Sequence, residues 1–385
     1  MLTVIETLDE ISRGTSPLIY FSRYRADRVD NGGARRVAQL RQILAGYEVE
    51  FVSSQARQEL LAVDEGATSG NGLFEWALQE AIRMLTRKYS AEFGRWIFFS
   101  DRLARRWVRA LKKRQPPRLV LVDDPIFFPS LIRFCSEQGI PVVAFCQNIE
   151  TLSRGQVVPR HQKELLLYEL SLLGQCRAVV TIASEEAFLL RNLGQAVIHL
   201  PYYPPDAIEE QLLAIRQRRM TTDKRDFILL GSAGNAPTRE GMARLLAAWR
   251  TMGDLSGERL LVVGYGTEVL RDASSMSGVE FCGAISDEAL ADLLGRIRGG
   301  IVYQEHGAGA LTRIGEYLLA GVPVLANIHA LRSYRNLAGT VELASLDDLP
   351  SALTSFLSGA PSVPLPPHTA ATPLRELLDT VLQGN

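Results

Sequence analysis

Short apolar runs alternate along this chain with longer segments whose apolar residues recur at helical spacing. In the first half the apolar runs occupy residues 17–21, 48–52, 118–122, 141–145, 177–182 and 196–200. Amphipathic segments lie between them, such as 127–138, 161–173 and a helix that opens at Gly32-Gly33 and ends at Gly46. This alternation predicts parallel strands connected by helices, with 17–21 as the first strand of an α/β fold.

The pattern stops at Pro201-Tyr-Tyr-Pro204-Pro205 and then begins again. Proline clusters of this kind interrupt regular elements, so we interpret the segment as a linker between two domains. A length of 385 residues also exceeds the usual size of one domain. Further strands are predicted at 226–230, 259–263, 279–282, 301–303 and 323–325, and a closing helix near 373–383 follows a stiff segment at 362–367.

These boundaries predict an N-terminal domain over residues 1–203 and a C-terminal domain over 204–366. The remaining residues, 367–385, form a final helix. Residues 56–116 or thereabouts interrupt the strand and helix alternation of the first half, and we predict a mostly helical insertion there.

Composition excludes several classes of protein. Hydrophobic residues make up 46% of the chain and charged residues 22%, as in an ordinary soluble protein with a sizeable core. Lys and Arg (42) balance Asp and Glu (43), which argues against a general polyanion binder, and no nucleic-acid motif occurs. No apolar run of about 18 residues predicts a membrane span, and the N-terminus lacks a secretory signal pattern, so a cytoplasmic protein is expected.

Metal-binding patterns are weak in this sequence. The four cysteines and five histidines are scattered, without the spacing typical of metal ligands. Asp123-Asp124 is the nearest acidic pair, but Pro125 follows at once and no second acidic cluster supports it. We therefore predict reduced thiols, no metal site and no bound cofactor.

The strongest candidate site is the segment that begins Gly307-Ala-Gly309 and continues through Arg313 to Glu316. A short apolar strand leads into this glycine-rich turn, and the turn opens a predicted helix of about three turns that ends at Gly321. Unpaired N–H groups and positive dipole gather at a helix N-terminus, which suits an anion such as a diphosphate. Glu316, about two turns inside, would meet hydroxyl groups of a ligand anchored there. The spacing predicts a nucleotide-sugar site.

A series of motifs resembles the GT-B glycosyltransferases of the large retaining family numbered four, in the same order along the chain. The resemblance covers most of the chain outside the insertion and is strongest in the second half. Its motifs are Asn31-Gly-Gly33, Gln147-Asn-Ile-Glu150, Ala183-Ser-Glu-Glu186, Leu200-Pro-Tyr-Tyr-Pro204, Gly231-Ser232, Val263-Gly-Tyr-Gly266, Phe281-Cys-Gly283 and Gly307-Ala-Gly309 with Glu316, Gly321 and Pro323. It implies two Rossmann-like domains facing each other across a cleft, with the nucleotide held mainly by the second domain and the final helix crossing back to the first.

The same resemblance implies roles for the glycine loop. Glu316 matches the family acid that accepts hydrogen bonds from both ribose hydroxyls, which a carboxylate can do at once. Gly309 and its neighbour Ala310 would offer backbone N–H groups to the diphosphate, since a residue without Cβ allows close approach. Gly33 would bring the N-terminal helix against the other side of the diphosphate.

Two arginines are candidates for the catalytic charge. Arg313 lies where many relatives carry Lys or Arg one turn before the acid, and Arg239 is the one cation in the loop after the first strand of the second domain. Either would offset charge on the departing diphosphate. Gly283 and Ala284 match the stretch whose backbone contacts the nucleobase in relatives.

One departure from the family concerns the donor sugar. Many members carry a second glutamate eight residues before the ribose-binding acid, and Ala308 occupies that position here. Glu305 or His306, from the same loop, are the candidates to supply the missing contact. Because of this departure, the sequence does not identify the donor sugar, and a catalytically inactive relative of the family remains an alternative interpretation.

The loop after the fourth strand of the first half is the candidate acceptor site. Many relatives place a histidine where Gln147 stands. In a retaining transfer with front-face departure the leaving phosphate takes the acceptor proton, so no side-chain base is required there. Asn148 and Glu150 then become candidates for contact with the acceptor, together with Gln147.

Residues 101–114 combine an apolar stripe, Leu103, Trp107 and Leu111, with seven Lys and Arg residues. Such a helix suits the surface of an anionic membrane, which would place the protein at the inner face of the membrane. The alternative is a stripe that packs on its own domain while the arginines stay in solvent. Both interpretations are open at this point.

We therefore predict a metal-independent retaining glycosyltransferase that moves a sugar from a nucleoside-diphosphate donor to a hydroxyl acceptor, in the synthesis of a bacterial surface glycan. The acceptor would be a glycan, a lipid-linked molecule or another hydroxyl compound. Two alternatives remain. One is a non-catalytic GT-B scaffold that binds a nucleotide sugar or a partner enzyme, and the other is a nucleotide-sugar epimerase.

Overall fold

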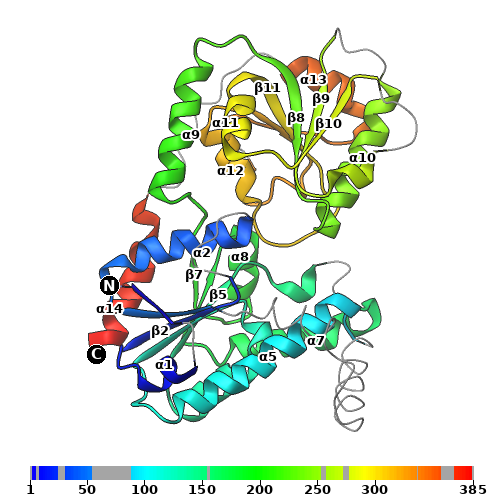
Figure 1. Cartoon of the computed structure of the whole chain (residues 1–385). Coiled ribbons are helices and arrows are strands. Elements are labelled where there is room, and N and C mark those ends of the chain that lie inside the picture. The colour runs from blue at the N-terminus through cyan, green and yellow to red at the C-terminus, as the bar shows by residue number, and fades with distance from the viewer. Residues whose placement is uncertain are drawn as a thin grey trace, which may run out of the picture. The chain divides into compact units, whose positions relative to one another are not determined.

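The computed structural model describes residues 2–5, 8–24, 31–53, 88–153, 157–252, 257–271, 277–335, 337–356 and 368–383. They form two compact units (Figure 1). Unit 1 comprises Met1–Pro201 together with Thr369–Asn385, and unit 2 comprises Tyr202–His368. Most of the predicted insertion before residue 88 and the predicted stiff segment 362–367 lie outside the described residues.

A parallel sheet forms the centre of unit 1. In the described residues its strands pair in the order β1-β3-β2-β4-β5-β6-β7. Strands β2, β4 and β5 are buried along their whole length, as expected for a parallel sheet covered on both faces. The bounds are β1 Leu2–Ile5, β2 Leu18–Ser22, β3 Val49–Ser53, β4 Leu119–Asp123, β5 Val142–Cys146, β6 Ala178–Thr181 and β7 Val197–His199.

The first strand of the chain is β1, not the apolar run at 17–21 that the pattern placed first. It pairs with β3 in parallel at the edge of the sheet. A four-residue run at the end of a chain carries little periodicity, because only a longer window separates strand from helix spacing. The apolar run itself is β2, and it pairs with both β3 and β4.

The helices of unit 1 include the last one of the chain, which returns to the unit of the N-terminus. Tyr47 Oη donates a hydrogen bond to Asp379 Oδ1 (2.8 Å), and Arg118 Nη1 donates to the carbonyl oxygen of Leu382. The bounds are α1 Leu8–Arg13, α2 Gly32–Ile43, α5 Ala91–Leu111, α6 Pro129–Glu137, α7 Gln162–Leu173, α8 Ser184–Asn192 and α14 Thr372–Gln383.

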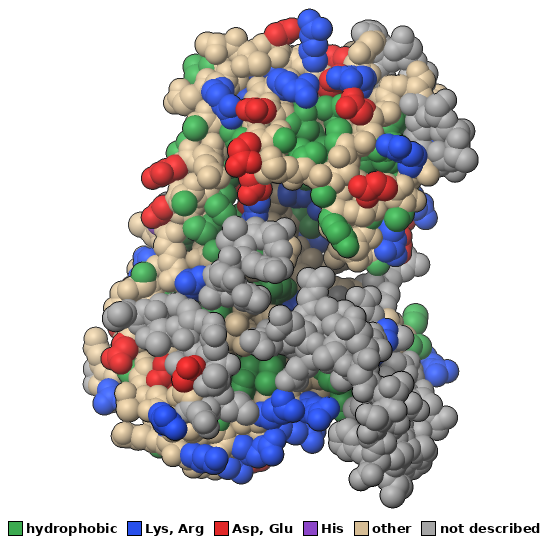
Figure 2. Space-filling view, viewed as in Figure 1, with side chains coloured by type: hydrophobic (Ala, Val, Ile, Leu, Met, Phe, Trp, Pro, Cys, Tyr) green, Lys and Arg blue, Asp and Glu red, His purple; other side chains and the backbone are tan. Residues whose placement is uncertain are grey.

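Helix α5 uses its apolar stripe inside unit 1. Trp107 is 2% exposed and its ring lies 4.7 Å from that of Phe21 and 5.3 Å from that of Phe128, measured between centroids. Leu111 is buried in the same cluster and Leu103 packs against it. Figure 2 shows Lys and Arg side chains gathered along the lower edge of unit 1, the region of α5 in Figure 1.

The predicted membrane contact through 101–114 is therefore not supported. A helix on a membrane surface buries its apolar face among lipids, and here that face belongs to the protein core. Across the described ranges, no helix has the length and apolar composition needed to cross a bilayer.

Unit 2 is a second parallel sheet whose described strands pair in the order β10-β9-β8-β11-β12-β13. Its last edge strand, β13, was not among the predicted strands, and it has only three residues. The bounds are β8 Arg225–Leu230, β9 Leu260–Val263, β10 Val279–Gly283, β11 Ile297–Val302, β12 Val324–Ala326 and β13 Thr340–Glu342.

Neighbouring residues of these strands face opposite sides of the sheet, as the pleat requires. Phe227 and Leu229 join one apolar cluster, and Ile228 joins the other. The cluster that contains Ile228 also includes residues of α9 Asp206–Arg219, α11 Asp287–Arg296 and α12 Thr312–Leu319. The cluster that contains Phe227 and Leu229 also includes residues of α10 Ala236–Thr251 and α13 Leu349–Phe356 (Figure 1).

Helix α12 is shorter than predicted. It begins at Thr312, so it has 8 residues instead of about three turns, and Glu316 lies little more than one turn inside it. Gly307 (φ +133°) and Gly309 (φ +70°) adopt backbone conformations with positive φ, which a right-handed helix excludes. The predicted end is correct, because Gly321 (φ +74°) adopts the left-handed conformation that follows many helices.

Both sheets reverse their strand order at one point. The reversal falls between β2 and β4 in unit 1 and between β8 and β11 in unit 2. In open α/β sheets, ligands bind outside the carboxyl ends of the strands at such a switch point. These two edges are therefore the places to examine for function.

Candidate functional site

Glycines let the loops at the carboxyl edge of the unit 2 sheet touch one another. A Cβ at Gly264 would lie 2.0 Å from Gly231 O, and a Cβ at Gly241 would lie 1.9 Å from Tyr303 O. No side chain fits at either distance. The loops after β8 and β9 are thus held in backbone contact through the predicted glycine motifs at Gly231 and Gly264, and the loop after β11 is held against helix α10 at Gly241.

Arg332 holds the glycine loop after β11. Its Nε donates to Gly309 O (2.9 Å), and its Nη2 donates to Ala308 O (3.3 Å) and to Gln304 Oε1 (3.3 Å). Gln304 is 2% exposed and its amide donates to Thr238 Oγ1 of α10 (3.3 Å). Arg332 was missed in the sequence because it binds carbonyl oxygens more than 20 residues away, and no motif encodes such a contact.

Arg313 places a positive charge at the carboxyl edge of the unit 2 sheet. Its Nε is buried without a hydrogen-bond partner, and in the described part of the chain it forms no ion pair with a carboxylate. Burial lowers its pKa, and the nearby Arg332 cation lowers it further. A Cβ on Gly231 would lie 3.5 Å from Arg313 Nη1, so the guanidinium lies beside the loop after β8. A partly buried cation in this state is suited to an anionic ligand.

Three backbone donors in and beside the glycine loop are also unused. The N–H groups of Gly307, Ala308 and Ala310 form no hydrogen bond with any group in the described ranges. Helix α12 follows directly, and its N-cap, Leu311, has no side chain that could satisfy the first N–H groups of the helix. The predicted anion site at Gly309 and Ala310 therefore has donors, helix dipole and a cation in one place.

Glu316 is buried, with 9% of its surface exposed. Its Oε1 accepts a hydrogen bond of 2.7 Å from Tyr202 Oη. The sequence did not indicate this phenol, because it lies 114 residues earlier in the chain. The predicted ribose acid is thus not a solvated helix residue, and one of its oxygens has a protein donor.

Glu305 and His306 pair with α10. Glu305 Oε1 lies 2.7 Å from Arg244 Nη1, and His306 Nε2 lies 2.8 Å from Glu240 Oε2. Arg239, also on α10, is exposed and donates from Nη1 to Ala233 O (3.0 Å). The two residues predicted to replace the acid missing at Ala308 are already engaged with this helix.

An apolar surface lies at the ends of β9 and β10. Gly264 N donates to Gly283 O (2.7 Å), and Ala233 N donates to Tyr265 O (2.9 Å), so this corner adjoins the loop after β8. Tyr265 is 74% exposed and Val269 is 72% exposed, while Ala284 is also exposed. Large apolar side chains that stay this exposed are candidates for ligand contact.

The switch point of unit 1 gathers a second set of polar groups. Asp124, at the end of β4, has a left-handed backbone (φ 43°) and is buried. Its carboxylate accepts from Arg23 Nε (3.1 Å) and from the N–H of Gln147 (3.1 Å). Tyr24 packs on Gly33, where an added Cβ would lie 2.3 Å from the phenol ring. Gln147 Nε2 is 3.5 Å from Gly33 O, so the predicted residues Gln147 and Gly33 do come together.

The other predicted acceptor residues form an internal pair. Asn148 Nδ2 donates to Glu150 Oε1 (3.1 Å), and Glu150 is only 2% exposed. The N–H of Glu150 donates to the buried Glu169 (3.0 Å). In this structure Glu150 shapes the loop after β5 and is not presented to solvent.

Asp123 is fully buried next to Asp124. Both of its oxygens lack a hydrogen bond, although the Ser22 and Tyr20 hydroxyls are near. Burial, and then the charge of Asp124, raise its pKa to about 7. The folded protein therefore holds a proton that the unfolded chain releases at about pH 4.

The raised pKa of Asp123 predicts that the free energy of unfolding changes with pH. Between about pH 4 and 7 the folded state binds more protons here than the unfolded state, so its contribution to the free energy of unfolding falls as pH rises. Asp123→Asn should flatten that fall, measured by urea unfolding at several pH values. A variant whose stability changes with pH as steeply as that of the wild type would contradict the assignment.

No known family model matches this sequence, and no curated protein matches it. Solved structures do match in fold. Sucrose-phosphate synthase from Thermosynechococcus elongatus is 16% identical, with a TM-score of 0.58, over 96% of this chain and 94% of that one. The UDP-forming α,α-trehalose-phosphate synthase from Burkholderia vietnamiensis is 11% identical, with a TM-score of 0.57 and 96% of both chains covered.

A third similar structure is a trehalose-6-phosphate synthase whose reaction is described as glycosyltransfer with retention. It is 12% identical, with a TM-score of 0.54 and 96% of both chains covered. Coverage of both halves confirms the predicted GT-B architecture, an α/β chain with two Rossmann-like units. At these identities the likeness concerns the fold.

Proposed function

We propose that this protein is a glycosyltransferase that moves a sugar from a nucleoside-diphosphate donor to a hydroxyl acceptor. The observation that carries the proposal is Arg313, a cation without a carboxylate partner beside the unused N–H groups of the glycine loop, among the residues that the structure describes. A diphosphate would satisfy both. The GT-B fold, shared with enzymes named as phosphosugar synthases, gives the chemistry its setting.

The roles follow from where each group lies. Gly309 and Ala310 bind the diphosphate, Arg313 stabilises the charge that builds up on it as the sugar leaves, and Arg239 offers a second cation on α10. The ribose hydroxyls donate to Glu316, and the base lies on the surface formed by Gly283, Ala284 and Tyr265. In many enzymes, stabilising the charge that develops in the transition state lowers the barrier more than any other single effect.

The finer features of the reaction are part of the same proposal. We infer retention of configuration, which suits an acceptor loop whose Gln147 is not a base, and which is the outcome described for one similar structure. Arg313 and the N-terminus of α12 supply positive charge, so we infer that transfer needs no divalent ion. The acceptor would bind near Gln147 in unit 1, and a bacterial surface glycan is its proposed class.

A nucleotide panel followed by a turnover assay tests this proposal. UDP, GDP, ADP, CDP and dTDP are compared by thermal shift, since a ligand at 100 times its Kd adds about 2.7 kcal/mol of stability. The matching nucleotide sugars are then incubated with the protein in EDTA, and released nucleoside diphosphate is measured. Release of nucleotide, with the anomeric configuration of the product read by NMR, supports the enzyme.

The scaffold alternative has its own support in this structure. Ala308 cannot replace the acid found in relatives, and Glu305 and His306 are held by α10. A scaffold that binds the donor would bind one nucleotide of the panel. It would release no nucleoside diphosphate from the nucleotide sugar with any acceptor tested. A panel in which no nucleotide binds would count against the enzyme and leave the scaffold that binds a partner enzyme.

Tyr265 is expected to stack on the nucleobase. Tyr265→Ala should weaken nucleoside-diphosphate binding about 5- to 150-fold, which corresponds to the 1–3 kcal/mol that stacking of one base contributes in other proteins. Binding of inorganic pyrophosphate should not change, because that probe has no base. Met220→Ala removes another exposed side chain of unit 2 (78% exposed) and is the control. Equal nucleotide affinity for Tyr265→Ala and wild type would remove this residue from the site.

A further inference from the structure

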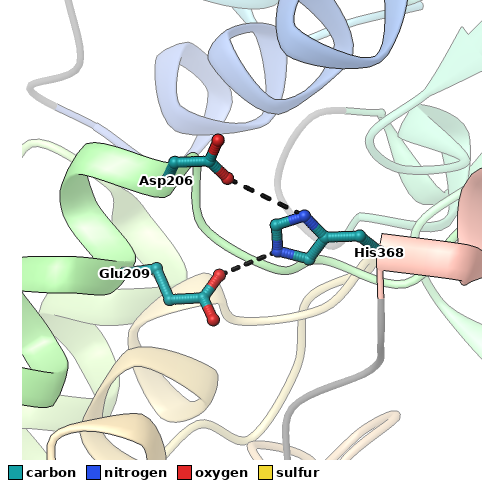
Figure 3. A group of neighbouring side chains, drawn as sticks. All are labelled: Asp206, Glu209 and His368. Atoms are coloured by element: carbon teal, nitrogen blue, oxygen red, sulfur yellow. Dashed lines mark hydrogen bonds and ion pairs between the residues drawn. The ribbon is translucent and has the colours of Figure 1, made fainter.

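Asp206, Glu209 and His368 form a cluster outside the candidate donor site. Figure 3 shows the imidazole of His368 pointing between the two carboxylates, with a different ring nitrogen toward each. His368 Nε2 lies 2.8 Å from Glu209 Oε2, and Nδ1 lies 3.7 Å from Asp206 Oδ1. One ligand atom from each of the three residues lies within 4.8 Å of the others. We propose that these residues bind a divalent transition-metal ion of the Zn²⁺ class.

The donor set favours that class of ion. One imidazole nitrogen and two carboxylate oxygens are ligands that Zn²⁺ commonly takes in proteins, whereas Mg²⁺ and Ca²⁺ prefer oxygen alone. Two bonds of about 2.0–2.1 Å at a tetrahedral angle separate their ligand atoms by about 3.3 Å. The nitrogen and oxygen that now lie 2.8 Å apart need to separate only slightly to accept the ion. Asp206 faces the other ring nitrogen at 3.7 Å, so its exposed side chain has to turn toward the Nε2 side to become the third ligand.

The imidazole is already oriented. The Tyr203 ring stacks on it, with 4.7 Å between centroids and 15° between planes, and Tyr203 is 2% exposed. A fixed ring reduces the entropy that is lost when its nitrogen binds a metal. The two carboxylates lie near each other, because Asp206 and Glu209 are three residues apart on the first turn of α9 and therefore lie on one face.

The ion would join the two ends of unit 2. Tyr203 and α9 follow its first residue, and His368 is its last residue before the chain continues into α14. Because 159 residues separate Glu209 from His368, the sequence spacing that argued against a metal site could not reveal this one. We therefore expect the ion to stabilise the fold of unit 2 at its ends and not to take part in transfer.

Zinc titration of the full chain tests the site. Protein stripped with EDTA and dialysed is titrated with ZnCl₂ by calorimetry at about pH 7.5, and melted with and without the metal. One Zn²⁺ per chain and a higher Tm are expected, and the same concentration of MgCl₂ should leave the Tm unchanged. Binding should weaken as the pH is lowered to about 5.5, because protons compete with a metal ion for its ligand atoms.

Three variants locate the ion. His368→Ala and Glu209→Gln should each weaken binding about 100-fold or more, beyond the 10- to 100-fold that loss of an outer-shell partner costs, and abolish the rise in Tm. Both residues are partly exposed, so circular dichroism should show folded proteins. His161→Ala removes another His and Glu pair, His161 with Glu164 at 3.3 Å, and should bind zinc as the wild type does.

The proposal fails if the wild type binds no stoichiometric zinc, or if His368→Ala binds it equally well, as binding to thiols would give. It also fails if His368→Ala changes stability only at low pH while zinc has no effect on the wild type. In that case the cluster is a protonated histidine held by two acids. Nucleotide binding plays no part in these readouts, so the result is independent of the proposed function.

Discussion

Arg313→Met is expected to abolish nucleotide-dependent stabilisation while leaving the nucleotide-free protein as stable as wild type, or more so. The side-chain stem of methionine keeps the apolar contacts of arginine, and the change removes a charge that is desolvated without a carboxylate partner in the described part of the chain. Loss of one charge-stabilising donor from a reaction site lowers turnover about 10²- to 10³-fold, or about 2.7–4 kcal/mol. Thermal melts with and without nucleoside diphosphate, and released diphosphate, measure the two effects.

The matched control is Arg219, another buried arginine of unit 2. Its guanidinium donates to Gly321 O (2.9 Å) and Ile297 O (2.8 Å), and also to Leu294 O. Arg219→Met leaves those carbonyl groups without donors, so it should lower the Tm while nucleotide still stabilises the folded fraction. If Arg313→Met instead destabilised the protein and kept nucleotide binding, Arg313 would be a structural residue and the anion site would lie elsewhere.

The elements that the sequence predicted best are those buried on both faces. Strands β4 and β5 begin and end within one residue of the predicted runs. A strand that is buried on both faces of a parallel sheet is a continuous apolar run, so turn residues on either side mark its ends. The edge strands β1 and β13 were missed, since three or four residues carry little pattern. Helix α12 was overextended, because the positive φ of Gly307 and Gly309 cannot be read from composition.

The candidate site was predictable where it depends on local order. Gly309 and Arg313 reach the carboxyl edge of the sheet because they follow β11 directly, and that order is visible in the sequence. The contacts of Arg332 with the loop, and of Tyr202 with Glu316, depend on tertiary packing across tens of residues. Glu305 and His306 show the same limit, since α10, which pairs with both, lies more than 50 residues away in sequence.

The carboxylate of Glu316 has a structural contact with Tyr202 in addition to its proposed contact with the ribose. Tyr202 Oη donates to Oε1 at 2.7 Å, and the residue is 9% exposed. Glu316→Ala would therefore leave the buried phenol without its acceptor as well as remove the ribose contact. Glu316→Gln separates the two effects, because the amide oxygen can still accept from Tyr202 while the negative charge is lost.

Donor binding should weaken by about 1.5–3 kcal/mol in Glu316→Ala, the scale of hydrogen bonds to a charged group, and in the same direction but by less in Glu316→Gln. Calorimetry with the nucleoside diphosphate and its 2′-deoxy form tests the assignment directly. Wild type should prefer the ribose form, Glu316→Ala should lose that preference, and Glu316→Gln should keep only part of it.

Tyr202→Phe is the control for Glu316, since it removes the protein donor and keeps the carboxylate. It should lower the Tm but bind the ribose form about as well as wild type, because the carboxylate proposed to accept from the ribose is still present. A folded Glu316→Gln that still distinguishes ribose from deoxyribose, at unchanged affinity, would assign this carboxylate to the contact with Tyr202 alone. Ribose recognition would then have to come from another group at the carboxyl edge of the sheet.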